Sequence, residues 1–312
     1  MTNRAVSDPP YLIDSDTGAD DAMAILLAAA FAPERLRLLL ATYGNYQRVT
    51  TAANFATMAA LGGIRLPVLL GADGPLASSP RVVPRGVVFA EYSPDFPAPA
   101  APAVDGDFPD ALYDALCAAG VMDYIALGPL TSLAMLLERH PDAVDHIRRV
   151  VLMGGGIDCA NITPYAEYNI YCDAEAAERV FASALEIHMV PLNACTPTAL
   201  PEEEAARLLA GCGRLTRCVG HLLQIENDLS ASFGNTPGIF YDAVALAYYL
   251  RPDLFATRRV GVAVSTAGET YGQTVLTDRR SNVVWVQSAD LPGYFSLLRD
   301  CVERLEAAAR GV

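Results

Sequence analysis

The sequence contains no lysine, although it is 312 residues long. Its 22 basic residues other than histidine are therefore all arginine, against 36 aspartates and glutamates. This absence excludes a Schiff-base lysine, a P-loop lysine and a lysine general base, because arginine cannot replace lysine as a nucleophile or a base. The net charge of −14 also disfavours anionic partners, so we expect neither nucleic acid nor a membrane surface as a partner.

Histidine is scarce too, and the cysteines lack the spacing of a metal site. There are only four histidines, and the seven cysteines include no C-x-x-C pair. An odd number of cysteines without that spacing argues against a zinc cluster and against a disulfide scaffold. The pattern is typical of reduced thiols, so we expect a cytoplasmic protein.

Long apolar segments are missing as well. The longest apolar run, 22–32, is shorter than the roughly 20 residues that span a bilayer, and residues 1–10 have no apolar core of a signal peptide. Hydrophobic residues nevertheless make up 52% of the chain and charged residues only 19%. That composition predicts a large buried core rather than disorder.

Short apolar runs alternate with helical patterns along the chain. We expect strands at residues 11–13, 36–43, 66–70, 122–127, 150–153 and 187–192. We expect helices at residues 22–31, 50–61, 110–119, 132–139 and 174–184. This alternation predicts an α/β fold with a parallel sheet covered by helices on both faces.

Three further segments complete the predicted organisation. The Pro- and Ala-rich stretch 93–109 is expected to be a surface loop, but not a domain boundary, because the alternation continues on both sides of it. Residues 202–238 are expected to be a helical insertion, and alternating runs within 260–286 suggest late strands.

Four aspartates lie within eight residues, directly after the first expected strand and before the first expected helix. They are Asp14, Asp16, Asp20 and Asp21, with Gly18 permitting a tight turn. Capping of the helix would explain one or two of them. Four like charges this close are costly without a cation, and a hard divalent ion with oxygen ligands would resolve their repulsion. Ligands of open parallel sheets bind beyond the carboxyl ends of the strands, which is where this cluster falls.

The other expected strand ends also carry polar groups and glycines. Asn45 follows the second strand, Gly128 follows Leu127, and three glycines follow Met153. Further candidates on this pattern are Asn161, Glu167, Asn169 and Asp242. Amides and carboxylates together suit a ligand with many hydroxyl groups, such as a sugar.

These motifs, taken in order, resemble the nucleoside hydrolases. The segment Asp14-x-Asp16-x-Gly18-x-Asp20-Asp21 is similar to the aspartate signature of that family. The similarity continues through Gly44-Asn45, 71–76, 127–131, 153–156, Asn161, 166–169 and Asp173, and ends at Asp242-Ala243. The resemblance implies a single open, Rossmann-like, mostly parallel sheet in one domain spanning residues 1–312. It also implies hydrolysis of ribonucleosides to ribose and free base, in nucleoside catabolism and purine or pyrimidine salvage.

The resemblance also implies roles for individual residues. It implies a calcium ion as cofactor and a homodimer or homotetramer as the assembly. The implied calcium ligands are Asp16, Asp21, the backbone carbonyl of Leu127, and Asp242. Asp16 would also be the general base for the attacking water. The implied ribose contacts are Asp20, Asn45, Met153, Asn161, Glu167 and Asn169, and Asp14 would support the aspartate loop.

Two positions depart from the family pattern. Tyr241 stands where many members carry a histidine before the last aspartate, and Arg85-Gly86 stands where a His-Gly is common. A catalytic Tyr241 would donate a proton or a hydrogen bond to the leaving base, but a phenol with a pKa near 10 is a poor acid without tuning. The alternative is that Tyr241 only packs or stacks on the base. The sequence does not indicate which base is preferred.

Two other functions fit parts of the same pattern. The run Asp14-Ser15-Asp16-Thr17 also resembles the D-x-D-x-T motif of haloacid-dehalogenase-like phosphotransferases, with Asp14 as nucleophile and magnesium as the ion. That chemistry usually needs a lysine, which this chain lacks. The missing histidine motivates a second alternative, a non-catalytic, calcium-dependent binder of ribose or nucleosides, which the plausible base Asp16 opposes.

Overall fold

A ten-stranded sheet forms the centre of the molecule within the residues that the structure describes. This computed structural model describes residues 9–76, 87–99, 103–104, 106–278 and 281–311. The spatial order of the strands is β4-β3-β2-β1-β5-β6-β7-β10-β8-β9. All neighbours from β4 to β10 are parallel, whereas β8 runs antiparallel to both β10 and β9. The prediction of an open, mostly parallel α/β sheet is confirmed.

The described strands and helices have the following bounds. The strands are β1 (Tyr11–Ser15), β2 (Leu36–Ala41), β3 (Val68–Leu70), β4 (Ala103–Val104), β5 (Met122–Ala126), β6 (Ile147–Met153), β7 (Ile187–Val190), β8 (Phe255–Val264), β9 (Thr274–Thr277) and β10 (Val283–Ala289). The helices are α1 (Ala19–Phe31), α2 (Arg48–Leu61), α3 (Phe89–Tyr92), α4 (Asp110–Ala119), α5 (Thr131–Arg139), α6 (Tyr168–Cys172), α7 (Ala174–Ala182), α8 (Leu192–Cys195), α9 (Glu202–Leu208), α10 (Arg214–Phe233), α11 (Tyr241–Leu250) and α12 (Leu291–Ala309).

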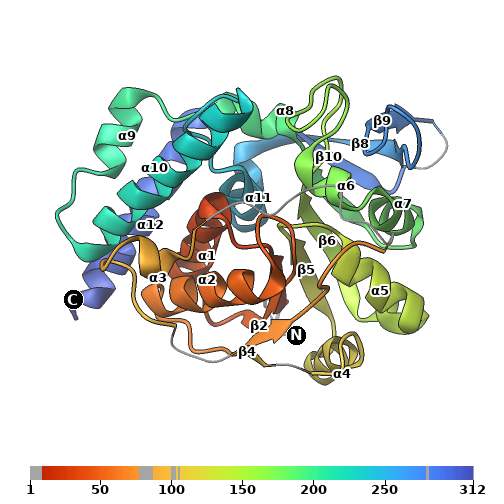
Figure 1. The fold of residues 1–312 in the computed structure, drawn as a ribbon, viewed down its shortest axis with the longest axis horizontal. Coiled ribbons are helices and arrows are strands. Elements are labelled where there is room, and N and C mark those ends of the chain that lie inside the picture. The colour runs from red at the N-terminus through yellow and green to blue at the C-terminus, as the bar shows by residue number, and fades with distance from the viewer. Residues whose placement is uncertain (1–8, 77–86, 100–102, 105, 279–280, 312) are drawn as a thin grey trace, which may run out of the picture.

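Helices cover both faces of this sheet (Figure 1). Because side chains alternate along a strand, Tyr11 and Ile13 of β1 enter one apolar core and Leu12 enters the other. The first core packs the sheet against α1, α2, α10, α11 and α12, and the second packs it against α4, α5 and α7. The strands are therefore buried on both sides, which explains their continuous apolar sequences.

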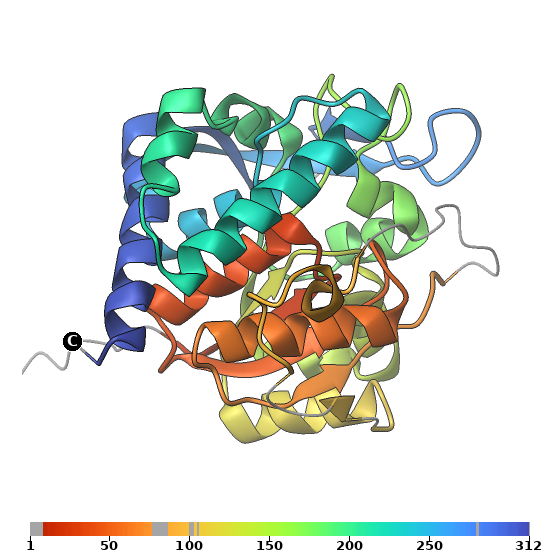
Figure 2. The ribbon, with the colours of Figure 1, turned by 60° about the vertical axis from the view of Figure 1, so that its left-hand side comes forward.

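Part of the chain differs from the expected organisation. Residues 103–104 form the short edge strand β4, paired in parallel with β3, so the prediction that 93–109 is only a surface loop is wrong. A two-residue strand in a Pro- and Ala-rich stretch leaves too short a pattern to recognise. The expected insertion at 202–238 contains α9 and the long helix α10, which lies along α1 (Figure 2).

The carboxyl ends of the central strands meet at one edge of the sheet. Ser15, the last residue of β1, pairs with Ala41 at the end of β2, and Asp14 pairs with Ala126 at the end of β5. Ala126 in turn pairs with Leu152 near the end of β6. The residues that follow these strands therefore lie close together.

Among the described helices, none is long and apolar enough to cross a membrane.

Candidate active site

The loop between β1 and α1 holds the acidic cluster in a buried position. Asp21 is fully buried and accepts hydrogen bonds from Ser15 Oγ at 2.6 Å and from the Gly18 backbone N–H at 2.8 Å. Both bonds fix the start of α1, so helix capping accounts for the position of Asp21. Capping does not account for Asp16, which is also buried and lies before the helix.

Asp16 is held by the loop that follows β2. Its Oδ2 atom accepts a hydrogen bond from the Asn45 backbone N–H at 2.6 Å. A Cβ atom at Gly44 would lie 2.0 Å from that same Oδ2, so a glycine is required for this approach. Asp16 Oδ1 is buried and makes no hydrogen bond within the described residues, and the same is true of Oδ1 of Asp242.

The carboxyl groups of the cluster repel one another. Burial raises the pKa of Asp16 and of Asp242 well above the usual range, and the neighbouring aspartates raise both further. Burial, with the charge of Asp20 next, raises the pKa of Asp21 to about 7. Without a counterion the metal-free cluster is therefore partly protonated near neutral pH.

The carboxylates that lie close enough to share an ion are not the same set as the predicted metal ligands. Oxygen atoms of Asp20, Asp21 and Asp242 all lie within 4.8 Å of one another, close enough to share one cation. Asp20 was expected at the ribose and is part of this group, whereas Asp16 was expected as a ligand and is not. The unpaired oxygens of Asp16 and Asp242 and the all-oxygen composition fit a hard cation such as calcium.

The carbonyl of Leu127 faces the side chain of Asn169. Asn169 Nδ2 donates to the Leu127 oxygen at 2.9 Å and to the Met153 oxygen at 3.2 Å. A carbonyl oxygen has two lone pairs, so this contact leaves Leu127 one acceptor site for a further ligand. Asn169 thereby ties the ends of β5 and β6 together at the floor of the site.

Glu167 has a structural task in addition to its predicted contact with ribose. It is the N-cap residue of α6, and its carboxylate accepts from the backbone N–H groups of Asn169 and Ile170. It also accepts from the Gly155 N–H at 2.8 Å, in the glycine turn after β6. Asn161 accepts from the Tyr168 N–H at 2.9 Å, so it fixes the loop that leads into α6.

These residues surround one cavity of about 740 Å³, part of it open to solvent. Of the residues predicted for catalysis, substrate binding or metal binding, all line the cavity except Asp21, which is fully buried. Those lining residues are Asp16, Asp20, Asn45, Leu127, Met153, Asn161, Glu167, Asn169, Tyr241 and Asp242. The structure thus brings together side chains that are more than 200 residues apart in the sequence.

The sequence analysis missed the wall that α10 contributes. Glu226, Leu229, Ser230 and Phe233 line the cavity, together with Asn235 just beyond the helix. The four helical positions have the i, i+3, i+4, i+7 spacing of one helix face. That spacing was the signal available in the sequence, but it does not indicate what the face contacts. The remaining missed lining residues are Ile162 and Tyr168.

No histidine is among the described residues that line the cavity. Tyr241 does line it, and burial followed by the charge of Glu226 raises its pKa, which makes the phenol a still weaker acid. Arg85 lies outside the described residues. Asp14, the nucleophile in the phosphotransferase alternative, does not line the cavity, and its carboxylate accepts a hydrogen bond from the buried Tyr124 hydroxyl at 2.6 Å.

Comparison with known proteins identifies the family. Residues 11–296 match the family model described as inosine-uridine preferring nucleoside hydrolase. The chain is 32% identical to the pyrimidine-specific ribonucleoside hydrolase RihA of Shewanella woodyi, over 94% of this chain and 98% of that one. It is 36% identical to the non-specific ribonucleoside hydrolase RihC of Shigella dysenteriae, over 86% of this chain and 88% of that one.

A solved structure supports the same fold. The purine-preferring ribonucleoside hydrolase from Gardnerella vaginalis superposes with a TM-score of 0.84 at 22% identity, covering 96% of this chain and 99% of that one. These matches support the predicted nucleoside hydrolase. They support neither the haloacid-dehalogenase-like phosphotransferase nor the non-catalytic binder of ribose or nucleosides. The chain therefore belongs to the inosine-uridine preferring nucleoside hydrolase family, enzymes that hydrolyse the N-glycosidic bond of ribonucleosides to ribose and free base.

Proposed function

We propose that this chain hydrolyses ribonucleosides with the help of a calcium ion at the aspartate cluster. The observation that carries the proposal is the convergence of the β1–α1 loop, the Leu127 carbonyl and Asp242 on the floor of one cavity. The buried, unpaired oxygens of Asp16 and Asp242 lie at that floor. A calcium ion bound there would bind a water molecule, lower its pKa and orient it for attack.

The residues proposed to hold the ion are Asp16, Asp21, Asp242 and the carbonyl of Leu127. Asp20 lies within the same carboxylate group, so its place is at the boundary between the ion and the ribose. An all-oxygen set of buried carboxylates and a carbonyl suits calcium rather than zinc, which prefers nitrogen and sulfur ligands.

The cavity lining offers groups for both parts of a nucleoside. Amide and carboxylate groups that would bind the ribose hydroxyls come from Asp20, Asn45, Asn161, Glu167 and Asn169, and Met153 also lines the cavity. The lining also includes the apolar side chains of Ile162, Leu229 and Phe233 and the ring of Tyr241. A flat, apolar-faced base would pack there, with Tyr241 stacking on it or donating a hydrogen bond.

Asp16 is proposed to act as the general base. The Asn45 N–H and the close approach of Gly44 hold Oδ2 in place, while Oδ1 has no partner and can accept the proton of the attacking water. Cleavage of the glycosidic bond leaves positive charge on the ribose, as in other glycoside hydrolyses, and the surrounding carboxylates stabilise that charge. The proton that Asp16 receives then passes to solvent.

The test is free ribose released from a panel of ribonucleosides, with calcium or with a chelator present. Asp21→Ala should lose calcium binding and ribose release together, because Asp21 is one of the three aspartates whose oxygens lie within 4.8 Å of one another. The matched control is Asp253→Asn, which removes an exposed carboxylate that is paired with Arg251 and does not line the cavity. Full activity of Asp21→Ala in chelator would contradict the metal assignment, and the panel identifies the preferred base.

Three further properties belong to the same proposal. We propose that residues 1–312 act as one domain, which is supported by a single sheet whose strands come from both halves of the described chain. Cytoplasmic location and assembly as a homodimer or homotetramer stay predictions, and size measurement of the purified protein in solution tests the second.

A further inference from the structure

One carboxylic acid of the cavity comes from α10 and not from the strand ends. Glu226 is only 4% exposed, although it lines the cavity from α10. Leu229 and Phe233 lie on the same helix face. A glutamate buried among such neighbours needs a partner or a proton, and the mechanism outlined above gives it no task.

One oxygen of Glu226 is fixed and the other is free. Ser230 Oγ donates a hydrogen bond to Glu226 Oε1 at 2.9 Å, one helical turn further along. Oε2 makes no hydrogen bond within the part of the chain that the structure describes, and it is not among the buried unpaired atoms. Oε2 is therefore the oxygen that remains accessible from the cavity.

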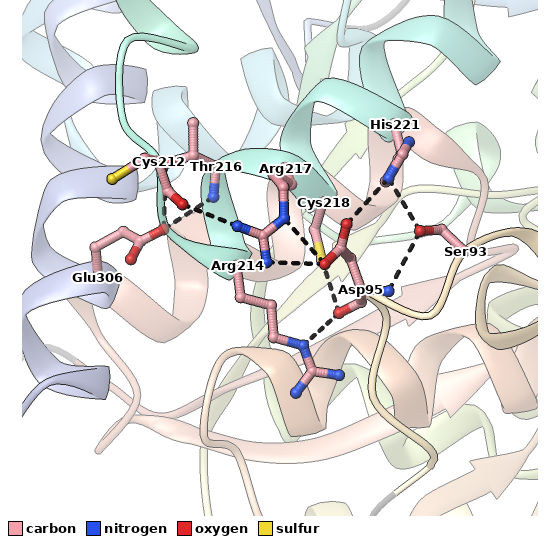
Figure 3. A network of polar contacts seen from close by, with 9 residues as sticks. All are labelled: Ser93, Asp95, Cys212, Arg214, Thr216, Arg217, Cys218, His221 and Glu306. Atoms are coloured by element: carbon pink, nitrogen blue, oxygen red, sulfur yellow. Dashed lines mark hydrogen bonds and ion pairs between the residues drawn. The ribbon is translucent and has the colours of Figure 1, made fainter.

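The helix that carries Glu226 is anchored by a network of polar contacts at its other end (Figure 3). Arg217 Nε donates to Asp95 Oδ1 at 3.0 Å, and Arg214 Nε donates to the Asp95 backbone oxygen at 2.5 Å. The Thr216 N–H donates to Glu306 of α12 at 3.0 Å. Ser93 and His221 are also joined, at 3.0 Å between Oγ and Nε2. These contacts hold α10 against two other segments, so Glu226 has a defined place over the cavity.

Burial favours the neutral form of Glu226. It raises the pKa of Glu226 well above its usual range, and the charges of Asp20 and Asp21 raise it further when no ion is bound at the aspartate cluster, while the Ser230 hydrogen bond lowers it. The charge of Glu226 in turn helps to raise the pKa of Tyr241 on α11. Tyr241 is thus the weaker acid of the two.

We propose that Glu226 is the general acid that protonates the departing base. This inference rests on the proposed function. It gives Glu226 the role of the acid, for which the described cavity lining offers no histidine. It follows from the place of Glu226 in the cavity wall beside Leu229 and Phe233, its accessible Oε2 and the attachment of α10 to α12. The residues 233–240, where Asn235 and the glycines lie, contain no titratable side chain that could take the role instead.

The proton balance of the step is complete. The bond between ribose and base breaks, its electron pair stays on the base, and the Glu226 carboxyl proton passes to an acceptor atom of that base. The attacking water gives its oxygen to the ribose and one proton to Asp16. The overall reaction consumes one water, and Glu226 regains its proton from solvent as Asp16 releases one.

The test compares two leaving groups in Glu226→Gln. Glutamine keeps the size of the side chain but has no acidic proton. We expect hydrolysis of the best nucleoside to slow about 10²- to 10⁴-fold in kcat, and that of p-nitrophenyl riboside, whose leaving group needs no protonation, to change less than about threefold. The alkaline limb of the kcat–pH profile should disappear. The matched control is Glu138→Gln, which removes an exposed glutamate paired with Arg179 and should leave both rates unchanged.

A second variant separates the acid from a packing residue. Ser230→Ala removes the hydrogen bond that lowers the pKa of Glu226, so the alkaline limb of the kcat–pH profile should move to higher pH. Equal slowing of both substrates in Glu226→Gln, or an unchanged rate with the nucleoside, would overturn the assignment. If the unaltered protein released ribose from neither substrate, the proposed function itself would fail instead.

Discussion

The metal-free protein should lose stability as the pH rises, because Asp21 is buried beside other carboxyl groups. Its pKa is about 7 in the fold, against the ordinary value of 3.8 that applies to an unfolded chain. The folded protein therefore keeps a proton that the unfolded chain has already lost. The resulting stabilisation is fully present below 3.8 and is lost as the pH rises through 7.

The size of the effect follows from the width of that window. Between roughly pH 5.5 and pH 7 the stabilisation by Asp21 falls by about 1.4 kcal/mol per pH unit, or about 2 kcal/mol in all. The comparison variant is Asp21→Asn, which has no proton to lose at this position. Exposed carboxylates with lowered pKa values, such as Asp95 and Asp110, titrate in both proteins, so their effects cancel in the difference. The charge of Asp21 also raises the pKa values of Asp16 and Asp242, and because the variant lacks this charge, their titration adds to the difference in the same direction.

The assay is urea unfolding in chelator at about pH 5.5 and about pH 8, for both proteins. We expect the free energy of unfolding of the unaltered protein to fall by at least about 2 kcal/mol more than that of Asp21→Asn over this range. Added calcium should raise the free energy of unfolding of the unaltered protein most at the higher pH, because the ion competes with protons for the same oxygens. Parallel pH curves of the two proteins in chelator would refute the reasoning.

Three further changes test the catalytic geometry. Asp16→Asn should lower kcat about 10²- to 10⁴-fold while much of the substrate affinity is kept, and a loss below about tenfold in steady-state assays would remove Asp16 from the role of base. Gly44→Ala should lower kcat because the added Cβ would lie 2.0 Å from Asp16 Oδ2. Gly74→Ala is the control and should keep kcat, because a Cβ there meets no atom within 4 Å. Similar kcat values for the two variants would contradict the role of Gly44. Tyr241→Phe should slow the nucleoside more than p-nitrophenyl riboside if the hydroxyl donates a hydrogen bond to the base, and should slow neither if Tyr241 only packs.

The site residues at the strand ends could be predicted from the sequence, and the reason is local. Asp16 follows β1 directly, Asn45 lies shortly after β2, and Met153 is the last residue of β6. Parallel strands bring their carboxyl ends together at one edge of the sheet. Most of the strands were predicted because each is a short apolar run in the sequence. Neither prediction required knowing how the helices pack on the sheet.

The α10 wall of the site depends on contacts between distant parts of the chain. Glu226 and Phe233 lie on an ordinary amphipathic helix, and only the packing of α10 along α1 places that face over the cavity. Late strands were expected within 260–286 from their alternating pattern, but the antiparallel direction of β8 and the place of the helix α12 are fixed by pairing and packing. The same holds within the aspartate cluster. The distances between carboxylate oxygens group Asp20 with Asp21 and Asp242, and the spacing of these residues in the sequence does not predict that group.

The most direct test of the account is the fate of the water oxygen when the protein cleaves a ribonucleoside. Uridine and inosine are incubated with the protein and calcium in oxygen-18 water, and the products are separated and weighed by mass spectrometry. We expect equimolar free ribose and free base, with one labelled oxygen on the ribose and none on the base, and about 10²- to 10⁴-fold slower release of both products by Asp16→Asn. Nucleosides that stay intact while bound to the unaltered protein, or label found on the base, would contradict it.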